Sequence, residues 1–170
     1  MLDTPPEPAF DDLTWLVAHV CQTPVALVTF IDARRQWFKS EVGLGLRETP
    51  LDASFCVHFV EQHGVIVVPD AAADERFRNN PLVNGAPHVR FYAEAPLDSA
   101  DGHRLGALCV LDYRPRDLTD AQRQALLALA RQVPLVFVDT NLFLDFYRAR
   151  NEVGSTLLNH LPLIQKHNGL

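Results

Sequence analysis

The chain has 170 residues, 48% hydrophobic and 21% charged, a balance typical of one globular domain with a sizeable buried core. Its net charge of −6 at pH 7 argues against nucleic acid as the main partner, because phosphate binding needs a concentrated basic surface. No apolar run is long enough to span a bilayer, and the acidic, proline-rich start MLDTPPEPAFDD resembles no targeting signal. We therefore expect a cytoplasmic protein without a membrane partner.

The first part of the chain predicts a helix followed by two strands. Apolar residues recur with a spacing of three and four between residues 8 and 22, which predicts a helix with one buried stripe. The stretch PVALVTFI, residues 24–31, has apolar side chains at both odd and even positions, which predicts a central strand that is covered on both faces. Residues 37–43 predict a second, more polar strand that pairs with the first. Residues 43–52 are expected to form a loop.

The middle of the chain predicts little regular structure. Residues 53–63 have the pattern of a short helix, and VIVV at residues 65–68 predicts a short buried strand. A long irregular stretch follows over residues 69–88, in which Asp74 is expected to cap a single helical turn. A loop of this length inside a compact domain is usually functional.

The last predicted elements are two strands and a helix. Residues 89–97 alternate between apolar and polar side chains, and residues 105–112 predict a buried strand that returns alongside them. Thr119 and Gln122 form a capping box that opens a helix through Val133. Together the elements predict one mainly antiparallel sheet with helices on one face, an α+β fold.

Three stretches occur in the order typical of a known family: LDTPPEPAFDDLTWLVAHVCQTPVALVTFIDARRQWFKSEVGLGLRETPLDASFCVH, VVPDAAADERFRNNPLVNGAPHVRFYAEAPL and DGHRLGALCVLDYRPRDLTDAQRQALLALARQV. They resemble the GAF domains of bacterial sensor kinases and cyclic-dinucleotide enzymes, and we assign residues 1–133 to a GAF sensory domain. The resemblance implies a six-stranded sheet that cups a small-molecule pocket under a long loop, and a helical face often used for dimerisation. It implies no single ligand, because GAF domains hold cyclic nucleotides, bilins, haem, amino acids or nothing.

The polar face of the strand at residues 89–97 is the candidate binding site, because it is expected to look toward the loop at residues 69–88. The candidate pocket residues are Phe55, Cys56, His58, Asp70, Phe77, His88, Arg90, Tyr92 and Glu94. The alternative gives the same side chains structural roles. In that interpretation, Arg90 pairs with Asp70 or Asp74 and Tyr92 fills the core.

The stretch SFCVHFV places Cys56 two residues before His58. Positions two apart on a helix diverge around its axis, so the two side chains are not expected to share a ligand. No second ligand stands at zinc spacing, and no third residue stands where it could orient a thiol–imidazole pair. We therefore predict no metal site and no catalytic residue, and expect Cys56 to be a buried thiol at the pocket wall.

No cofactor is predicted from these residues. Light-sensing GAF relatives typically present an adjacent Cys-His pair, whereas Val57 intervenes here, so neither bilin nor haem is expected. One GAF branch reduces free methionine sulfoxide with several cysteines, which need an exposed thiol of low pKa. Cys21 and Cys109 lie on a predicted apolar stripe and in a predicted core strand. A reductase of this type is therefore the alternative and not the leading hypothesis.

After Pro134 the stretch LVFVDTNLFLDFYRARNE resembles the opening of PIN-type nuclease domains. In that family the residue at Asp139 is the first of several carboxylates that bind a divalent metal ion, so it would be a ligand here only if a complete PIN domain followed. The later acidic residues of that fold do not occur within residues 134–170. We therefore expect this incomplete extension neither to bind nor to cut nucleic acid, and to pack on the GAF domain or a second copy.

Three functions remain open. The leading hypothesis is a non-enzymatic regulatory GAF module, a homodimeric sensor that binds a small molecule and controls an attached or partner output domain in signal transduction. The second is the redox enzyme, and the third is a dimerisation module with an empty pocket. In a longer protein the first hypothesis includes the sensory part of a GAF–PIN nuclease.

Overall fold

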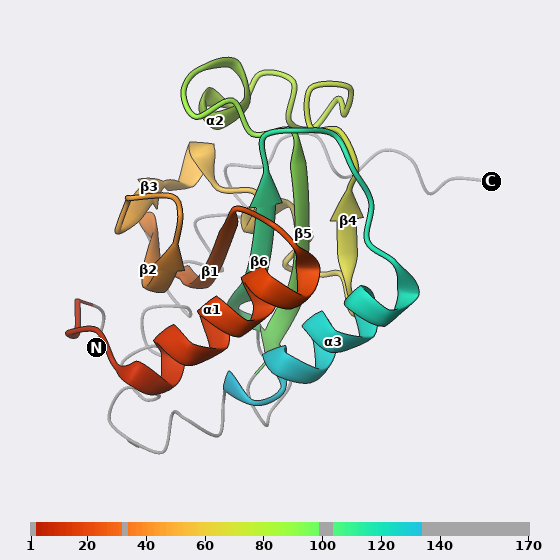
Figure 1. Cartoon of the computed structure of the whole chain (residues 1–170). Coiled ribbons are helices and arrows are strands. Elements are labelled where there is room, and N and C mark those ends of the chain that lie inside the picture. Colours follow the sequence, from red (N-terminus) through yellow and green to blue (C-terminus); the bar gives the residue numbers. More distant parts are fainter. Residues whose placement is uncertain (1–2, 32–33, 99–103, 134–170) are drawn as a thin grey trace.

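A six-stranded antiparallel sheet forms the centre of the computed structural model, which describes residues 3–31, 34–98 and 104–133 (Figure 1). The strand order is β3-β2-β1-β6-β5-β4. The strands are β1 (Val25–Ile31), β2 (Arg35–Val42), β3 (Glu48–Pro50), β4 (Ile66–Val68), β5 (Phe91–Asp98) and β6 (Arg104–Asp112). The predicted α+β architecture is confirmed.

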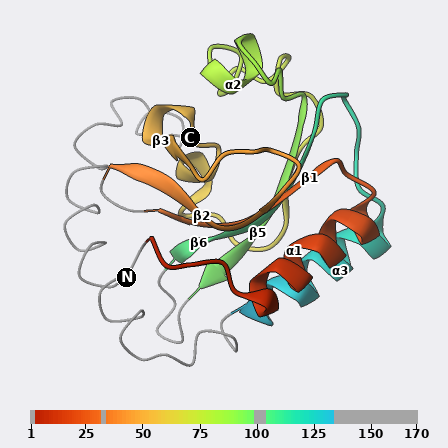
Figure 2. The ribbon, with the colours of Figure 1, turned by 60° about the vertical axis from the view of Figure 1, so that its left-hand side comes forward.

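Two helices cover one face of the sheet. Helices α1 (Pro8–Cys21) and α3 (Asp120–Ala130) lie side by side on it (Figure 2). Pro8 suits the first turn of α1, where its missing N–H removes no hydrogen bond. Thr119 and Gln122 form the predicted capping box of α3. Both helices turn apolar residues toward the sheet and form one core with it.

The opposite face is covered by short turns and by the long loop. Leu51–Ala53 and Cys56–Phe59 are 3-10 turns, and α2 (Pro81–Asn84) is a single turn within the long loop. A second apolar cluster lies between these segments and the sheet. The alternation of β5 separates the two cores, because Phe91 and Ala93 join the helical side while Tyr92 joins the loop side.

Two predicted segments between residues 43 and 63 differ from the structure. The predicted loop at residues 43–52 contains β3, which pairs with β2 through contacts that no local pattern reveals. The predicted short helix at residues 53–63 is shorter in the structure and of the 3-10 type, Cys56–Phe59, with bonds from His58 N to Phe55 O and, in the turn that follows, from Gln62 N to Phe59 O.

The long loop contains one regular element that was not predicted from the sequence. The side chain of Asn80 accepts a bond from Leu82 N and Pro81 takes the first helical position, so this turn signal opens α2. Val89 also differs, because it packs on the loop side of the sheet and not with Phe91. None of the helices in the described part of the chain has the length and apolar character needed to cross a bilayer.

The two edges of the sheet are formed by its shortest strands. Both β3 and β4 have three residues, whereas the inner strands have between seven and nine. Pro50 is the last residue of β3, and Pro69 directly follows β4. Neither proline can donate a hydrogen bond to a further strand.

Candidate functional site

A chain of hydrogen bonds crosses the loop side of the sheet from β2 to β5. Gln36 Nε2 donates to Cys56 Sγ over 3.0 Å, and Cys56 Sγ lies 2.9 Å from the Tyr92 hydroxyl. That hydroxyl donates to Glu94 Oε2. Because the hydroxyl has only one proton, it accepts from the thiol while it donates to the carboxyl. The direction of donation is therefore Gln36 to Cys56, Cys56 to Tyr92, and Tyr92 to Glu94.

Strands β1 and β6 extend this network beneath the thiol. Thr29 Oγ1 donates to Ala107 O over 3.2 Å and lies 3.6 Å from Cys56 Sγ. Cys109 Sγ lies 3.7 Å from Leu27 O and 4.0 Å from Thr29 Oγ1. Four strands and the Cys56–Phe59 turn therefore position one buried polar cluster.

Glu94 is the residue of this cluster whose hydrogen bonding is incomplete. Its side chain is fully buried, and among the described residues its Oε1 atom has no hydrogen-bond partner. The guanidinium of Arg104 lies 3.8 Å from that atom. Burial raises the pKa of Glu94 well above its usual value. An unpaired oxygen in a dry site is costly, and the group of a ligand could complete it.

Arg104 ties the turn that carries Cys56 to the sheet. From the first position of β6 its guanidinium donates to the carbonyl oxygen of Phe59 over 3.0 Å and to that of Gln62. The same side chain donates to Asp98 over 2.8 Å and is almost fully buried. Its charge is therefore shared between two carbonyl groups and the carboxyls of Asp98 and Glu94.

Aromatic rings occupy the space between this network and the long loop. Phe55 stacks between Phe77 and Tyr92, with ring centroids 4.5 and 4.7 Å apart. His58 meets the ring of Phe77 edge-on at 5.0 Å, and the guanidinium of Arg76 lies over the same ring at 5.3 Å. Flat faces of this kind suit a planar ligand.

The thiol and the phenol of the site are held in their protonated forms, which disfavours thiolate or phenolate chemistry. Burial, followed by the neighbouring Cys109 thiol, raises the pKa of Cys56 well above its ordinary value. Burial also raises the pKa of Tyr92. The pKa of His58 is lowered, first by burial and then by the charge of Arg76. At neutral pH the thiol and the phenol therefore keep their protons and act as hydrogen-bonding groups.

The structure brings together five of the nine candidate residues. The five are Phe55, Cys56, Phe77, Tyr92 and Glu94. His58 lies at the rim of this group, where it contacts Phe77. Cys56 and His58 point to different surroundings, the polar network and the aromatic rim, as expected for positions two residues apart.

The other three candidates lie outside the network. Asp70 fixes its own loop, because its Oδ1 accepts from the backbone N of Ala72. His88 is exposed and has a backbone φ of 62°. Arg90 donates to the carbonyl oxygens of Val83 and Val89, each over 3.0 Å, and not to Asp70 or Asp74. Asp74 pairs with Arg76 instead.

Sequence reasoning missed four polar members of the cluster: Thr29, Gln36, Arg104 and Cys109. The signal that could have found them is a polar residue within an apolar strand pattern, such as Thr29 in PVALVTFI. Within the described ranges, no three His, Cys, Asp or Glu side chains lie close enough to hold a metal ion. Asp139 lies outside the described residues, so its assignment stays a prediction.

Comparison with known proteins agrees with this architecture. The sequence model described as GAF domain matches residues 5–136. A cyclic di-GMP phosphodiesterase from Pseudomonas aeruginosa is 41% identical over 137 residues, which are 77% of this chain and 23% of that protein. The chain therefore spans about a quarter of the length of this curated relative.

Two solved structures share the fold at low sequence identity. The GAF domain from Acinetobacter phosphoenolpyruvate-protein phosphotransferase has a TM-score of 0.62 and 17% identity, over 80% of this chain and 84% of that one. The free methionine-R-sulfoxide reductase from Neisseria meningitidis has a TM-score of 0.57 and 17% identity, over 72% and 71%. At this level of identity the likeness concerns the fold alone.

Proposed function

Because the chain belongs to the GAF domain family, we propose that it is a non-enzymatic sensor module that binds a small molecule on the loop side of its sheet. The observation that carries this proposal is the Oε1 atom of the buried Glu94, at the end of the hydrogen-bond chain from Gln36, which has no hydrogen-bond partner among the described residues. A structural network would be expected to satisfy all of its own buried polar atoms.

The ligand that fits this chemistry is small, planar and able to donate an N–H group. Its donor would favour the ionised form of Glu94, in which Oε1 is free to accept, and would complete the hydrogen bonding of that carboxylate, while its ring would stack on the aromatic side chains of Phe55 or Phe77. Those rings pack closely on Tyr92, so a ligand must displace one of them. Ligand binding would then shift the long loop. An output domain that contacts the loop could respond to the difference between its free and ligand-bound conformations.

The output that we propose is the turnover of cyclic di-GMP. The support is the relative from Pseudomonas aeruginosa that is 41% identical and is named as a cyclic di-GMP phosphodiesterase. The aligned part makes up 23% of that relative. In this proposal, the GAF domain carries no part of the hydrolysis. It regulates a phosphodiesterase that is attached to it or that it contacts.

Thiol redox chemistry is not part of the proposal. Cys21, Cys56 and Cys109 are all buried, and burial raises the pKa of Cys56. A reductase needs an accessible thiolate and a resolving partner. The PIN-like interpretation of residues 134–170 lies outside the described residues and remains a prediction.

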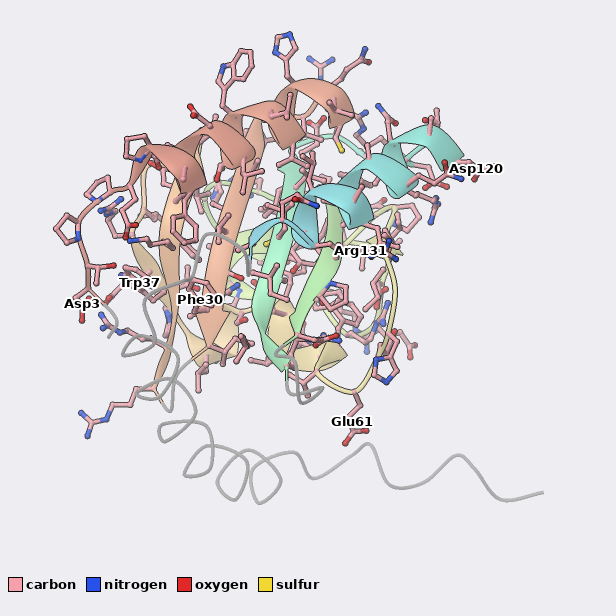
Figure 3. All side chains as sticks on the ribbon, turned by 90° about the horizontal axis from the view of Figure 1, so that it is seen from below. Asp3, Phe30, Trp37, Glu61, Asp120 and Arg131 are labelled. Atoms are coloured by element: carbon pink, nitrogen blue, oxygen red, sulfur yellow. The ribbon has the colours of Figure 1, made fainter. Side chains whose placement is uncertain are left out.

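Native mass spectrometry of the purified chain, beside a denatured control, tests the proposal. A non-covalent mass that leaves on denaturation is expected, and Glu94→Gln should reduce its occupancy about tenfold or more, because the one oxygen of the amide accepts from Tyr92 and its NH₂ group then faces the ligand's donor. Glu61→Gln is the matched control, since Glu61 is exposed and its side chain points outward from the molecule (Figure 3). Equal occupancy in Glu94→Gln and Glu61→Gln would contradict a ligand at Glu94.

A bound compound must also stabilise the native chain. Adding back the recovered compound should raise the melting temperature of the wild-type protein, since a ligand that binds only the folded state stabilises it. The same addition should leave Glu94→Gln nearly unchanged. The dimerisation module with an empty pocket would be favoured by two results together: protein that carries no bound mass, and a melting temperature that no component of a cell extract raises.

A further inference from the structure

The charges around Glu94 balance only while its carboxyl group is protonated. The guanidinium of Arg104 lies 3.8 Å from Glu94 Oε1, but it donates to Asp98 over the shorter distance of 2.8 Å. One carboxylate therefore already balances the charge of this arginine. An ionised Glu94 would add a second negative charge at a fully buried position, which is unfavourable unless another cation joins it.

The other titratable groups that face Glu94 are acids. The hydroxyl of Tyr92 comes from the same strand, and the thiol of Cys56 comes from the turn above it. Strand β6 places Cys109 directly opposite Glu94 in the register, beside the position of Arg104. Strand β4, on the other side of β5, contributes isoleucine and valine side chains only. Because acids surround the carboxyl, a ligand with a positive charge suits this site better than one with a negative charge.

The rim of the aromatic cluster already holds a planar cation between a carboxylate and two rings. The guanidinium of Arg76 lies over Phe59 at 4.9 Å and over Phe77 at 5.3 Å from the ring centroids. The carboxylate of Asp74 accepts from Nε of this guanidinium over 2.9 Å and from Nη2 over 2.5 Å. An aromatic face attracts a cation through its π electrons, so the rings of this cluster are suited to carry one.

The same two components, a ring face and a carboxyl group, stand together inside the site. Phe55 stacks on Tyr92, and the hydroxyl of Tyr92 bonds to Glu94. We propose that the ligand is a planar cation, an amidinium or a guanidinium, that donates an N–H to Glu94 Oε1 and stacks on Phe55 or Phe77. This inference rests on the proposed function, because it names the class of ligand that binds at Glu94. It adds that the ligand supplies the positive charge that the cluster lacks.

Binding of such a ligand exchanges one proton for one cation. In the free protein burial raises the pKa of Glu94, so the carboxyl group is protonated. When the cation binds, the O–H bond of the carboxyl breaks, the proton passes to the solvent, and the carboxylate accepts from the ligand. The total charge of the cluster is then unchanged. The affinity for a cation should therefore rise about tenfold per pH unit while the free carboxyl is protonated, and become constant above its pKa.

Benzamidinium, benzamide and benzoate test the charge of the ligand, because they share one planar shape and are cationic, neutral and anionic. Isothermal titration calorimetry of the full chain at neutral pH gives the dissociation constant of each probe. Benzamidinium should bind the wild-type chain about tenfold or more tightly than benzamide, and benzoate should bind most weakly. The amidinium and the amide both offer N–H donors, so the difference between them reports the charge.

Three variants locate the cation. Glu94→Gln should bring the dissociation constants of benzamidinium and benzamide within about threefold of each other, because no carboxylate forms there. Glu61→Gln removes an exposed carboxylate, and Asp74→Asn removes the carboxylate of the rim. Both should keep the preference for benzamidinium. A thermal melt of each variant without probe checks that the fold is retained.

The proton exchange can be measured on the wild-type chain alone. Titration of benzamidinium near pH 6 in phosphate and in bis-Tris, two buffers with different heats of ionisation, gives the number of protons released on binding. About one proton should be released per benzamidinium bound, and the number should fall toward zero as the pH is raised. Benzamide, which leaves the carboxyl free to keep its proton, should release fewer.

Several results would overturn the cationic ligand. Benzamidinium that does not bind, or that binds no more tightly than benzamide, would do so, and so would binding without proton release from about pH 5 to pH 8. A preference that survives Glu94→Gln and is lost in Asp74→Asn would place the cation at the rim. A neutral compound recovered from the native protein, with an occupancy that depends on Glu94, would exclude the cation and leave the proposed function standing. Occupancy that does not depend on Glu94 would contradict the proposed function itself.

Discussion

The sulfur of Cys56 lies 2.9 Å from the hydroxyl oxygen of Tyr92, although the two residues are 36 positions apart in the sequence. This contact joins the Cys56–Phe59 turn to the middle of β5. It also links the donor side of the network, at Gln36, to its acceptor end at Glu94. The effects of substitutions at these side chains on the free energy of unfolding should therefore not be additive.

Replacing Cys56 should reveal that its thiol acts as a hydrogen-bonding group. Cys56→Ala leaves the donor of Gln36 and the oxygen of Tyr92 each without a partner, so we expect a loss of about 1–3 kcal/mol in the free energy of unfolding. Cys56→Ser keeps both bonds and should cost less than Cys56→Ala, as measured by urea denaturation.

Cys21 supplies the matched control for this comparison. It is fully buried in the apolar core between helices and sheet, so a hydroxyl there gains none of the partners that the network offers. Cys21→Ser should therefore be no more stable than Cys21→Ala. The same order of serine and alanine at both positions would contradict a hydrogen-bonding role for Cys56.

The raised pKa of Glu94 predicts a specific pH dependence of stability. Burial favours the protonated form, so the folded protein holds this proton more tightly than the unfolded chain, where the ordinary value is 4.5. Its contribution is therefore fully present below that value and is lost as pH rises through the folded-state pKa. Urea denaturation between about pH 5 and pH 8 should show wild-type stability falling relative to Glu94→Gln.

In that experiment the glutamine variant serves as the neutral reference. Because its side chain does not titrate, the difference in unfolding free energy between the two proteins isolates the carboxyl of Glu94. A difference that does not change over the range, or that favours wild type more at higher pH, would mean that Arg104 compensates the charge fully.

Arg104 should contribute far more to stability than an arginine on the surface. Arg104→Met leaves the carbonyl oxygens of Phe59 and Gln62 without their donor, so we expect a loss of about 2–6 kcal/mol, and at a pH that ionises Glu94 it also leaves that carboxylate without its cation. Arg123→Met, which breaks the exposed pair with Asp117, should cost at most about 1 kcal/mol.

A double variant shows how much of that loss belongs to the carboxyl. At a pH high enough to ionise Glu94, Glu94→Gln should recover part of the stability lost in Arg104→Met, because no charge is then left unpaired. Strictly additive losses in the two variants would indicate that the 3.8 Å separation carries no interaction.

Gly106 is expected to tolerate no side chain. A Cβ atom at this position in β6 would stand 1.9 Å from the carbonyl oxygen of Thr29 in β1, so the two central strands must separate. We expect Gly106→Ala to cost about 3 kcal/mol or more, measured by thermal or urea denaturation. In the control Gly45→Ala, the Cβ atom meets nothing within 4 Å, and only the positive φ of 72° costs about 1–2 kcal/mol. Similar losses in both would contradict the close approach.

Much of the fold could be predicted because local patterns and the tertiary structure agree. The apolar run of β1 is buried on both faces, and the alternation of β5 sends Tyr92 and Glu94 to the loop side as expected. The capping box of Thr119 and Gln122 marked the start of α3 to the residue. Each of these signals acts within a few residues and so is visible in a single sequence.

The remaining features depend on distant partners. Strand β3 exists because Glu48–Pro50 reaches β2, and nothing within its three residues favours a strand. In the site, Thr29, Gln36 and Arg104 come from three different strands, and only their common direction toward Cys56 and Glu94 makes them a cluster. That direction follows from strand register, which the sequence alone does not specify.

The short edge strands have a consequence for how the protein behaves when it is crowded. A sheet grows into fibres when a long edge strand offers its free backbone groups to another chain, and β3 and β4 each offer only three residues with a proline beside them. Stacking of sheets edge to edge is therefore opposed at both ends. A concentrated solution of the protein should therefore resist the growth of sheet-based fibres and remain clear.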